Sequence, residues 1–72
     1  MTTNLSGLVA ANIRAELARR NIPQAAVADA LGLSNAAVSR RLNGRAPIDI
    51  DDLENIAGLL DVAPVSLLAE TA

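Results

Sequence analysis

The stretch that decides the fold is residues 24–44, which reads QAAVADALGLSNAAVSRRLNG. Its apolar residues recur at helical spacing in two short runs, and a turn of three residues, Gly32-Leu33-Ser34, separates the runs. Glycine at position 32 suits the left-handed conformation that commonly ends a helix, and the Ser34 hydroxyl can cap the helix that follows. The pattern predicts a helix over residues 23–31, a tight turn and a second helix over residues 35–42.

Several residues in this stretch suit two helices that cross closely. Ala28 is small at the point where the helices must approach each other, and Gly32 supplies the conformation of the turn. We expect the space between the helices to be filled by Val27, Leu31, Leu33 and Val38. These requirements coincide at one spacing, which is typical of a helix-turn-helix corner.

The chain before this corner is predicted to form one longer helix over residues 6–20. Asn21 ends this helix, and Pro23 opens the next one, because proline fits the first turn of a helix. One side of the helix is apolar, with Leu5, Leu8, Val9, Ile13 and Leu17. The other side is polar, with Asn12, Glu16, Arg19 and Arg20. We therefore expect the apolar side to face the core and the polar side to face water.

Two further helices are predicted after the corner. Asn43-Gly44 stops the preceding helix, Pro47 breaks the loop, and Asp49 caps a fourth helix. The inner face of this fourth helix holds Leu53, Ile56, Ala57 and Leu60. Pro64 opens a short last helix that offers Val65, Leu67 and Leu68 to the bundle. The expected fold is all-α, with five helices in a single domain over residues 1–72.

The composition excludes most catalytic and metal-binding chemistry. The 72 residues include no cysteine, histidine, lysine or aromatic residue, so thiol nucleophiles, imidazole bases and zinc sites are absent from the sequence. We expect no enzyme activity, no cofactor, no metal and no small-molecule substrate. The apolar stretches are much shorter than the roughly 20 residues of a membrane span. A soluble cytoplasmic protein without a membrane partner is therefore expected.

The charges are distributed unevenly along the chain. Residues 1–45 contain all six arginines and two acidic residues, which gives a net charge of +4. Residues 46–72 contain six acidic and no basic residues, which gives −6 and accounts for the overall charge of −2. Such a chain can present one basic face to a polyanion while it is acidic overall.

Residues 24–44 resemble the helix-turn-helix of the phage lambda repressor and Cro family. The resemblance extends over nearly the whole chain, from about Leu8 to Leu68, and includes the Asn43-Gly44 loop and the following helix. It implies a lambda-repressor-like DNA-binding domain that acts as a transcriptional regulator, with a repressor role of the phage immunity or Cro type. The partner implied is double-stranded operator DNA. In that family the second helix of the motif lies in the major groove.

The resemblance assigns roles to individual residues by position. Base edges would be contacted by Asn35, Ala36 and Arg40, since Asn pairs well with adenine, Arg with guanine, and Ala contacts a thymine methyl. The DNA backbone would be contacted by Gln24, Ser34, Asn43 and Arg45, and Gln24 would also brace Asn35. For Ser39 and Arg41 the sequence leaves a DNA contact and a structural role both open.

The sequence departs from the family pattern at two positions. Pro23 stands where a serine or threonine usually caps the first helix of the motif, which removes one side-chain cap. Arg41 stands where an apolar residue usually helps to bury the second helix. Its stem can lie on the core while its guanidinium group reaches water, a carboxylate of the fourth helix or a phosphate.

A homodimer on DNA is expected, because one short helix reads too few bases and two half-sites about 34 Å apart restore specificity. The last helix is the candidate interface, since the C-terminal region holds more apolar residues than a small core needs: Leu59, Val65, Leu67, Leu68 and Ala69. An alternative from another class is a helical protein–protein interaction module or an antitoxin-like module. An exposed apolar patch would favour this alternative, whereas exposed Arg40 and Arg45 beside Asn35 would favour DNA binding.

Overall fold

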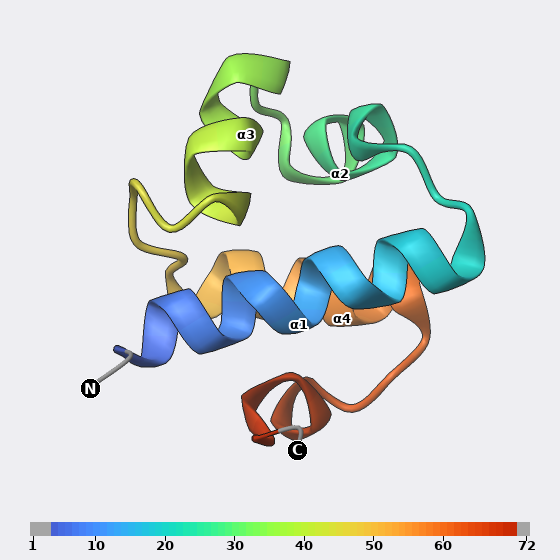
Figure 1. Cartoon of the computed structure of the whole chain (residues 1–72). Helices are drawn as coiled ribbons and strands as arrows, with labels where there is room; N and C mark the ends of the chain where they lie inside the picture. Colours follow the sequence, from blue (N-terminus) through green and yellow to red (C-terminus); the bar gives the residue numbers. More distant parts are fainter. Residues whose placement is uncertain (1–3, 71–72) are drawn as a thin grey trace.

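The computed structural model describes residues 4–70, and these residues form four α-helices and one 3-10 helix without any strand (Figure 1). The elements are α1 (Leu5–Arg20), α2 (Gln24–Leu31), α3 (Asn35–Leu42), α4 (Ile50–Leu60) and η1 (Pro64–Leu68). The expected fifth α-helix is thus wrong in type, because residues 64–68 form a 3-10 helix. A segment of five residues is short enough for the tighter 3-10 geometry, which is rarely sustained in longer runs.

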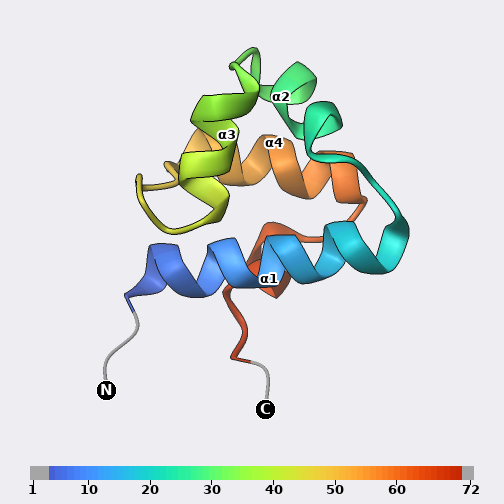
Figure 2. The same cartoon turned by 45° about the horizontal axis from the view of Figure 1, so that its top comes forward.

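The α2–α3 corner and η1 lie on opposite sides of the molecule. Figure 1 shows α2 and α3 above α1 and α4, with η1 below them. Figure 2 shows the corner again at the top, with α4 behind it and η1 behind α1. α1 contacts both α3 and η1, whereas α2 packs on α3 and α4. The two longer helices therefore form a scaffold between the corner and the C-terminal segment.

Side chains next to the helices satisfy their first backbone amides. Three helices begin at a polar cap: the Asn4 Oδ1 atom accepts from the Gly7 amide at 2.7 Å, Ser34 Oγ from Ala37 at 3.1 Å, and Asp49 Oδ1 from Asp52 at 2.7 Å. α2 differs, because Pro23 occupies its cap position and provides no side-chain hydrogen bond. α2 accordingly begins at Gln24, one residue after the predicted start.

Left-handed residues end three of the helices. Gly32 follows α2 with φ of 66°, as the sequence predicts, and Asn21 and Asp61 adopt φ of 55° and 56° after α1 and α4. In each case the amide of the left-handed residue donates to a carbonyl in the last turn of the helix, which satisfies an acceptor that the helix leaves open. The turn between α2 and α3 therefore has the geometry expected of Gly32-Leu33-Ser34.

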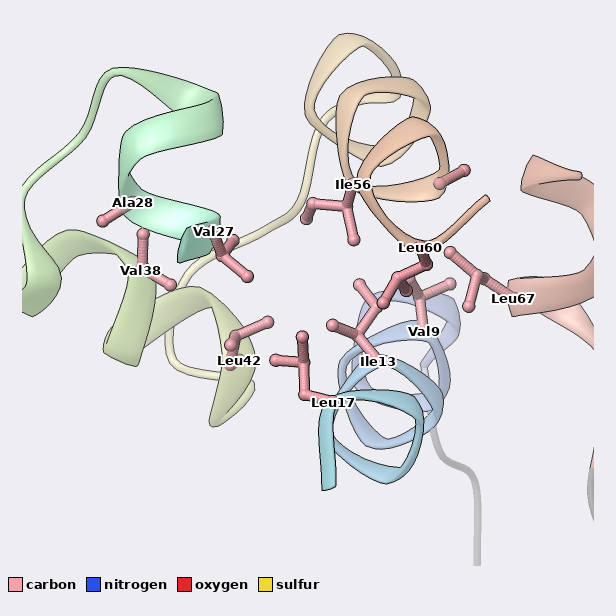
Figure 3. Packing of buried hydrophobic residues seen from close by; sticks show 11 residues of the cluster. Val9, Ile13, Leu17, Val27, Ala28, Val38, Leu42, Ile56, Leu60 and Leu67 are labelled. Carbon is pink, nitrogen blue, oxygen red and sulfur yellow. The ribbon is translucent and has the colours of Figure 1, made fainter. Parts of the chain in front are cut away.

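The core takes residues from every element (Figure 3). Its buried members are Val9, Ile13, Leu17, Val27, Ala28, Val38, Leu42, Ile56, Ala57, Leu60 and Leu67. Leu67 is only 2% exposed, so it belongs to the core and not to the surface that the sequence offers for dimerisation. Leu5 was expected on the inner stripe of α1, but it is 60% exposed and lines a surface groove at the start of the helix.

Asn12 corrects the prediction that the polar side of α1 faces water. Its side chain is buried, and its Nδ2 atom donates to the carbonyl oxygens of Leu67 and Ala69, both at 2.8 Å. A short 3-10 segment leaves carbonyl groups without partners, and a buried amide can satisfy two of them at once. Asn12 therefore fixes η1 against α1.

Two further findings concern residues 4–70 as a whole. No helix in this part of the chain is both long and apolar enough to cross a membrane. The same residues contain no cluster of three or more side chains suited to holding a metal ion.

Candidate nucleic-acid interface

α3 has one buried face and one exposed face. Val38 and Leu42, one turn apart, are both buried against the core. Ala36 and Arg40 are also one turn apart but lie on the outer side, and both are exposed. Asn35, the first residue of α3, is exposed as well. The three residues that the sequence predicts as base contacts are thus all accessible on one short helix.

The start of α3 brings three of the predicted residues together. The Ser34 hydroxyl caps α3, and the Gln24 Nε2 atom donates to the Asn35 carbonyl oxygen at 3.3 Å. This bond joins the first residue of α2 to the first residue of α3, so Gln24 braces the backbone of Asn35 and leaves its side chain unpaired among the described residues. The polar atoms of Gln24, Ser34 and Asn35 therefore gather at the N-terminal end of α3.

The other end of α3 places Arg45 close to Arg40. The Arg45 amide donates to the Arg40 carbonyl oxygen at 2.8 Å, and Gly44 makes this turn possible with φ of 75°. Asn43 is exposed, and its Nδ2 atom donates to the carbonyl oxygen of Ser39 at 2.8 Å and to its hydroxyl at 3.2 Å. Ser39 is therefore engaged in closing the end of the helix.

The arginines of α1 contact other parts of the protein. Arg14 donates to the carbonyl of Leu42, the last residue of α3, and Arg20 donates to the carbonyl of Leu60, the last residue of α4. Both bonds place a cation at the C-terminal end of a helix, where open carbonyls and the helix dipole favour positive charge.

Glu16 forms ion pairs with two guanidinium groups of the same helix, those of Arg19 and Arg20. Arg20 Nε lies 3.0 Å from one carboxylate oxygen of Glu16 and Arg19 Nη1 lies 2.6 Å from the other. The hydrogen bond from Arg20, together with the positive charge of Arg19, lowers the pKa of Glu16 below its usual value of 4.5. Arg19 and Arg20 thus both have an acidic partner on α1.

Arg41 points away from the exposed face of α3. Its Nη1 atom donates to the Ala37 carbonyl at 3.0 Å, and its Nε atom lies 3.5 Å from Asp52 Oδ2 in the first turn of α4. The sequence leaves water, a carboxylate of the fourth helix and a phosphate open as contacts of this guanidinium group. The structure shows the contact with the carboxylate. Arg40 and Arg45 are then the two arginines whose side chains have no hydrogen bond or ion pair with any residue in 4–70.

Three residues make contacts with distant partners that the sequence analysis does not assign. Arg14, Asn12 and Asp52 act on partners that are distant in the chain, for example 28 residues away for Arg14 and Leu42. Helical periodicity reports which side of a helix is apolar, but it gives no information on which distant carbonyl or guanidinium group needs a partner. No local signal in the sequence would have identified these residues.

The fold and the exposed face of α3 define a helix-turn-helix protein, and comparison with known families agrees. A family model described as helix-turn-helix matches residues 13–67, which is more than half of the chain and includes α2, the turn and α3. The protein therefore belongs to the Cro/C1-type helix-turn-helix family of DNA-binding transcription regulators. Comparison with curated proteins and with solved structures gives no match.

Proposed function

We propose that this protein is a repressor that binds operator DNA in a sequence-specific manner, with α3 in the major groove. The observation that carries the proposal is the pair of exposed arginines, Arg40 and Arg45, which have no partner among residues 4–70 and lie beside the accessible end of a helix-turn-helix. Phosphate contacts by basic side chains supply much of the affinity for DNA. The net charge of −2 does not oppose this, because the free positive charge is local.

Sequence reading is assigned to Asn35, Ala36 and Arg40. An exposed Asn can pair through two hydrogen bonds with adenine, and an exposed Arg can do so with guanine. Ala36 presents a methyl group that suits contact with a thymine methyl. All three lie on an eight-residue helix, which is short enough to fit in the major groove with its first turn toward the bases.

Positioning on the DNA backbone is assigned to Gln24, Ser34, Asn43 and Arg45. Gln24 and Ser34 lie at the start of α3, and Asn43 and Arg45 lie at its end. This arrangement suits the two walls of the groove, because each end of α3 then carries donors for a different phosphate strand. The repressor role follows from occupancy of the operator, whereas activation would require a further contact with the polymerase.

We further propose that the protein forms a homodimer on DNA through an apolar patch at the N-terminal ends of α1 and α4. The patch surrounds a groove lined by Leu5, Val9, Ile48, Ile50, Leu53 and Leu68. Ile50 is 82% exposed and Val65 is 69% exposed. Val65 shares a face of η1 with Leu68, because residues three apart are eclipsed in a 3-10 helix. In a two-fold dimer, the exposed Ile50 side chain of each protomer packs against the apolar groove of its partner, which is the self-complementary contact that this symmetry requires.

The proposal is tested by selecting bound sites from random duplex DNA. We expect a palindromic site with two half-sites about 34 Å apart and an affinity that falls steeply with salt. Ile50→Glu should abolish cooperative binding to this site but leave binding to one half-site, and the fold, unchanged. Recovery of no preferred sequence, with a salt slope near zero, would refute sequence-specific DNA binding.

The apolar patch also favours a second candidate function, a helical protein–protein interaction module or antitoxin-like module. Leu5 and Ile50 are large apolar residues exposed beside the same groove, and Val65 is a third large apolar residue that is exposed, as such a module requires. The same site selection separates the two functions. An interaction module should bind no duplex selectively, and its Arg40 and Arg45 could be replaced without consequence for partner binding.

A further inference from the structure

Two adjacent arginines of α3 have opposite environments. Arg40 is exposed and has no partner among the described residues, whereas Arg41 contacts Asp52 and the Ala37 carbonyl. The Arg41 side chain is 25% exposed and the Asp52 side chain 18% exposed, so the pair lies at the boundary between α3 and α4. Asp52 of α4 thus neutralises the positive charge of Arg41 on α3, the helix proposed to read the bases.

The contact between Arg41 and Asp52 is an ion pair of imperfect geometry. The Nε and Oδ2 atoms are 3.5 Å apart, and Nε has no hydrogen-bond partner among residues 4–70. The backbone of Asp52 is fixed in the capped first turn of α4, where its amide donates to Asp49, and the guanidinium group also donates to the Ala37 carbonyl. Asp52 and Ala37 therefore restrain the long side chain of Arg41 together, and Asp52 does so electrostatically.

An arginine on the flank of a helix in the major groove is within reach of a phosphate strand. A guanidinium group released there would add affinity for every sequence equally, because a phosphate contact carries no base information. The affinity for the operator and for the competing genomic sites, which are in large excess, would then rise by the same factor. Restraint of Arg41 keeps the sequence-independent part of the affinity low.

We infer that Asp52 limits the sequence-independent affinity for DNA, because it holds Arg41 away from the phosphates. This inference rests on the proposed placement of α3 in the major groove. Asp52 itself does not contact DNA in this account. It acts through Arg41, and it leaves Arg40 to read a base and Arg45 to contact the backbone.

Replacement of Asp52 by asparagine tests the inference, with Asp51→Asn as the matched control. Both changes remove one negative charge from the first turn of α4, but Asp51 is exposed and has no ion pair within residues 4–70. We expect Asp52→Asn to raise affinity for scrambled duplex about three- to eightfold near 0.1 M salt and to steepen the log–log salt slope by about 0.9. Affinity for the selected operator should rise by the same factor.

Two further variants separate release of Arg41 from a change in net charge. The double variant Asp52→Asn with Arg41→Gln has the net charge of the wild type and lacks the released arginine, so its salt slope should return to the wild-type value. Asp52→Glu retains the carboxylate and should retain the wild-type affinity for scrambled duplex and the wild-type salt slope. If Asp52→Asn is unfolded, Arg41→Gln alone should leave the salt slope unchanged, whereas Arg45→Gln should reduce it.

The possible failures are distinct. If the wild type binds duplex DNA with a salt slope and Asp52→Asn behaves as Asp51→Asn does, only the role of Asp52 is overturned. A lower salt slope for Arg41→Gln in an otherwise wild-type chain would also overturn it, since Arg41 would then already contact a phosphate. If the wild type shows no salt-dependent binding to its best selected duplex, the proposed function fails and this inference fails with it.

Discussion

α1 and the segment around α3 carry three arginines each, yet the two regions use them differently. On α1, Arg14 and Arg20 donate to the last carbonyls of α3 and α4, and Arg19 pairs with Glu16. Around α3, Arg40 and Arg45 are exposed without a partner in the described part of the chain. A count of arginines therefore overstates the basic surface, because half of them stabilise the helices against one another.

The difference follows from what surrounds each region. α1 lies beside the C-terminal ends of α3 and α4, and the open carbonyls there attract cations. The outer face of α3 has no such neighbour among the described residues, since α1 and α2 pack on its inner side (Figure 2). α1 is thus the scaffold and α3 the exposed helix. Four substitutions test this division, in order of decreasing effect.

Ile13→Ala should have the largest effect, and it should act on stability. Ile13 is fully buried on α1, so its truncation leaves a cavity between α1, α4 and the corner. We expect a loss of about 2–5 kcal/mol in the free energy of unfolding, measured by urea denaturation. A loss below about 1 kcal/mol would show that α1 is not the scaffold that the division assumes.

Arg40→Ala should have the next largest effect, and it should act on binding alone. A base contact of this kind is worth about 1–3 kcal/mol, so affinity for the selected operator should fall by that amount and selectivity should relax at one base position in each half-site. Stability should change by less than about 0.5 kcal/mol, because the side chain is exposed. Equal weakening on every duplex, in titrations against single-base variants, would make Arg40 a backbone contact instead.

Arg45→Ala should have a smaller effect that is the same for all sequences. Loss of one phosphate contact should reduce the log–log salt slope by about 0.9 and weaken operator and scrambled duplex alike. Arg19→Ala is the matched control, since it removes the same charge from α1, where Arg19 pairs with Glu16. The two variants should differ in salt slope, and identical slopes would remove the distinction between the two regions.

Glu16→Gln should have the smallest effect, and it should depend on pH. The hydrogen bond from Arg20 lowers the pKa of Glu16 below 4.5, so the ion pair stabilises the fold fully above pH 4.5 and is lost as the pH falls through the lowered pKa. The melting temperature of the variant should be slightly below that of the wild type near neutral pH, and the difference should vanish in acid. Weaker operator binding by the folded variant would indicate that α1 contributes to the interface.

The local features of the fold were predictable because neighbouring residues specify them. The turn at Gly32, the caps at Ser34 and Asp49, and the bounds of α3 all depend on contacts within four residues in the chain. The family was predictable for the same reason, since the signature of the corner is contained in residues 24–44. The predicted start of α2 is one residue too early, because Pro23 stands at the cap position and provides no side-chain hydrogen bond.

The exposure of the candidate site residues was predictable, but the contacts that support α3 were not. Exposure of Asn35, Ala36 and Arg40 follows from the positions of Val38 and Leu42 on the same helix. The direction of Arg41 does not, because a long side chain on the flank of a helix can turn to water, to a phosphate or to a carboxylate. The position of Asp52 on another helix decides among these.

From the sequence alone came the turn of the corner, the bounds of α3, the apolar side of α3 and the family. These properties depend on hydrogen bonds and periodicity within one or two turns. Only the tertiary structure decided that Asn12 is buried, that Leu67 is core while Ile50 is exposed, and that η1 is a 3-10 helix. The physical reason is that each of these depends on which carbonyls and apolar surfaces of distant segments come to lie nearby, and no local pattern encodes those partners.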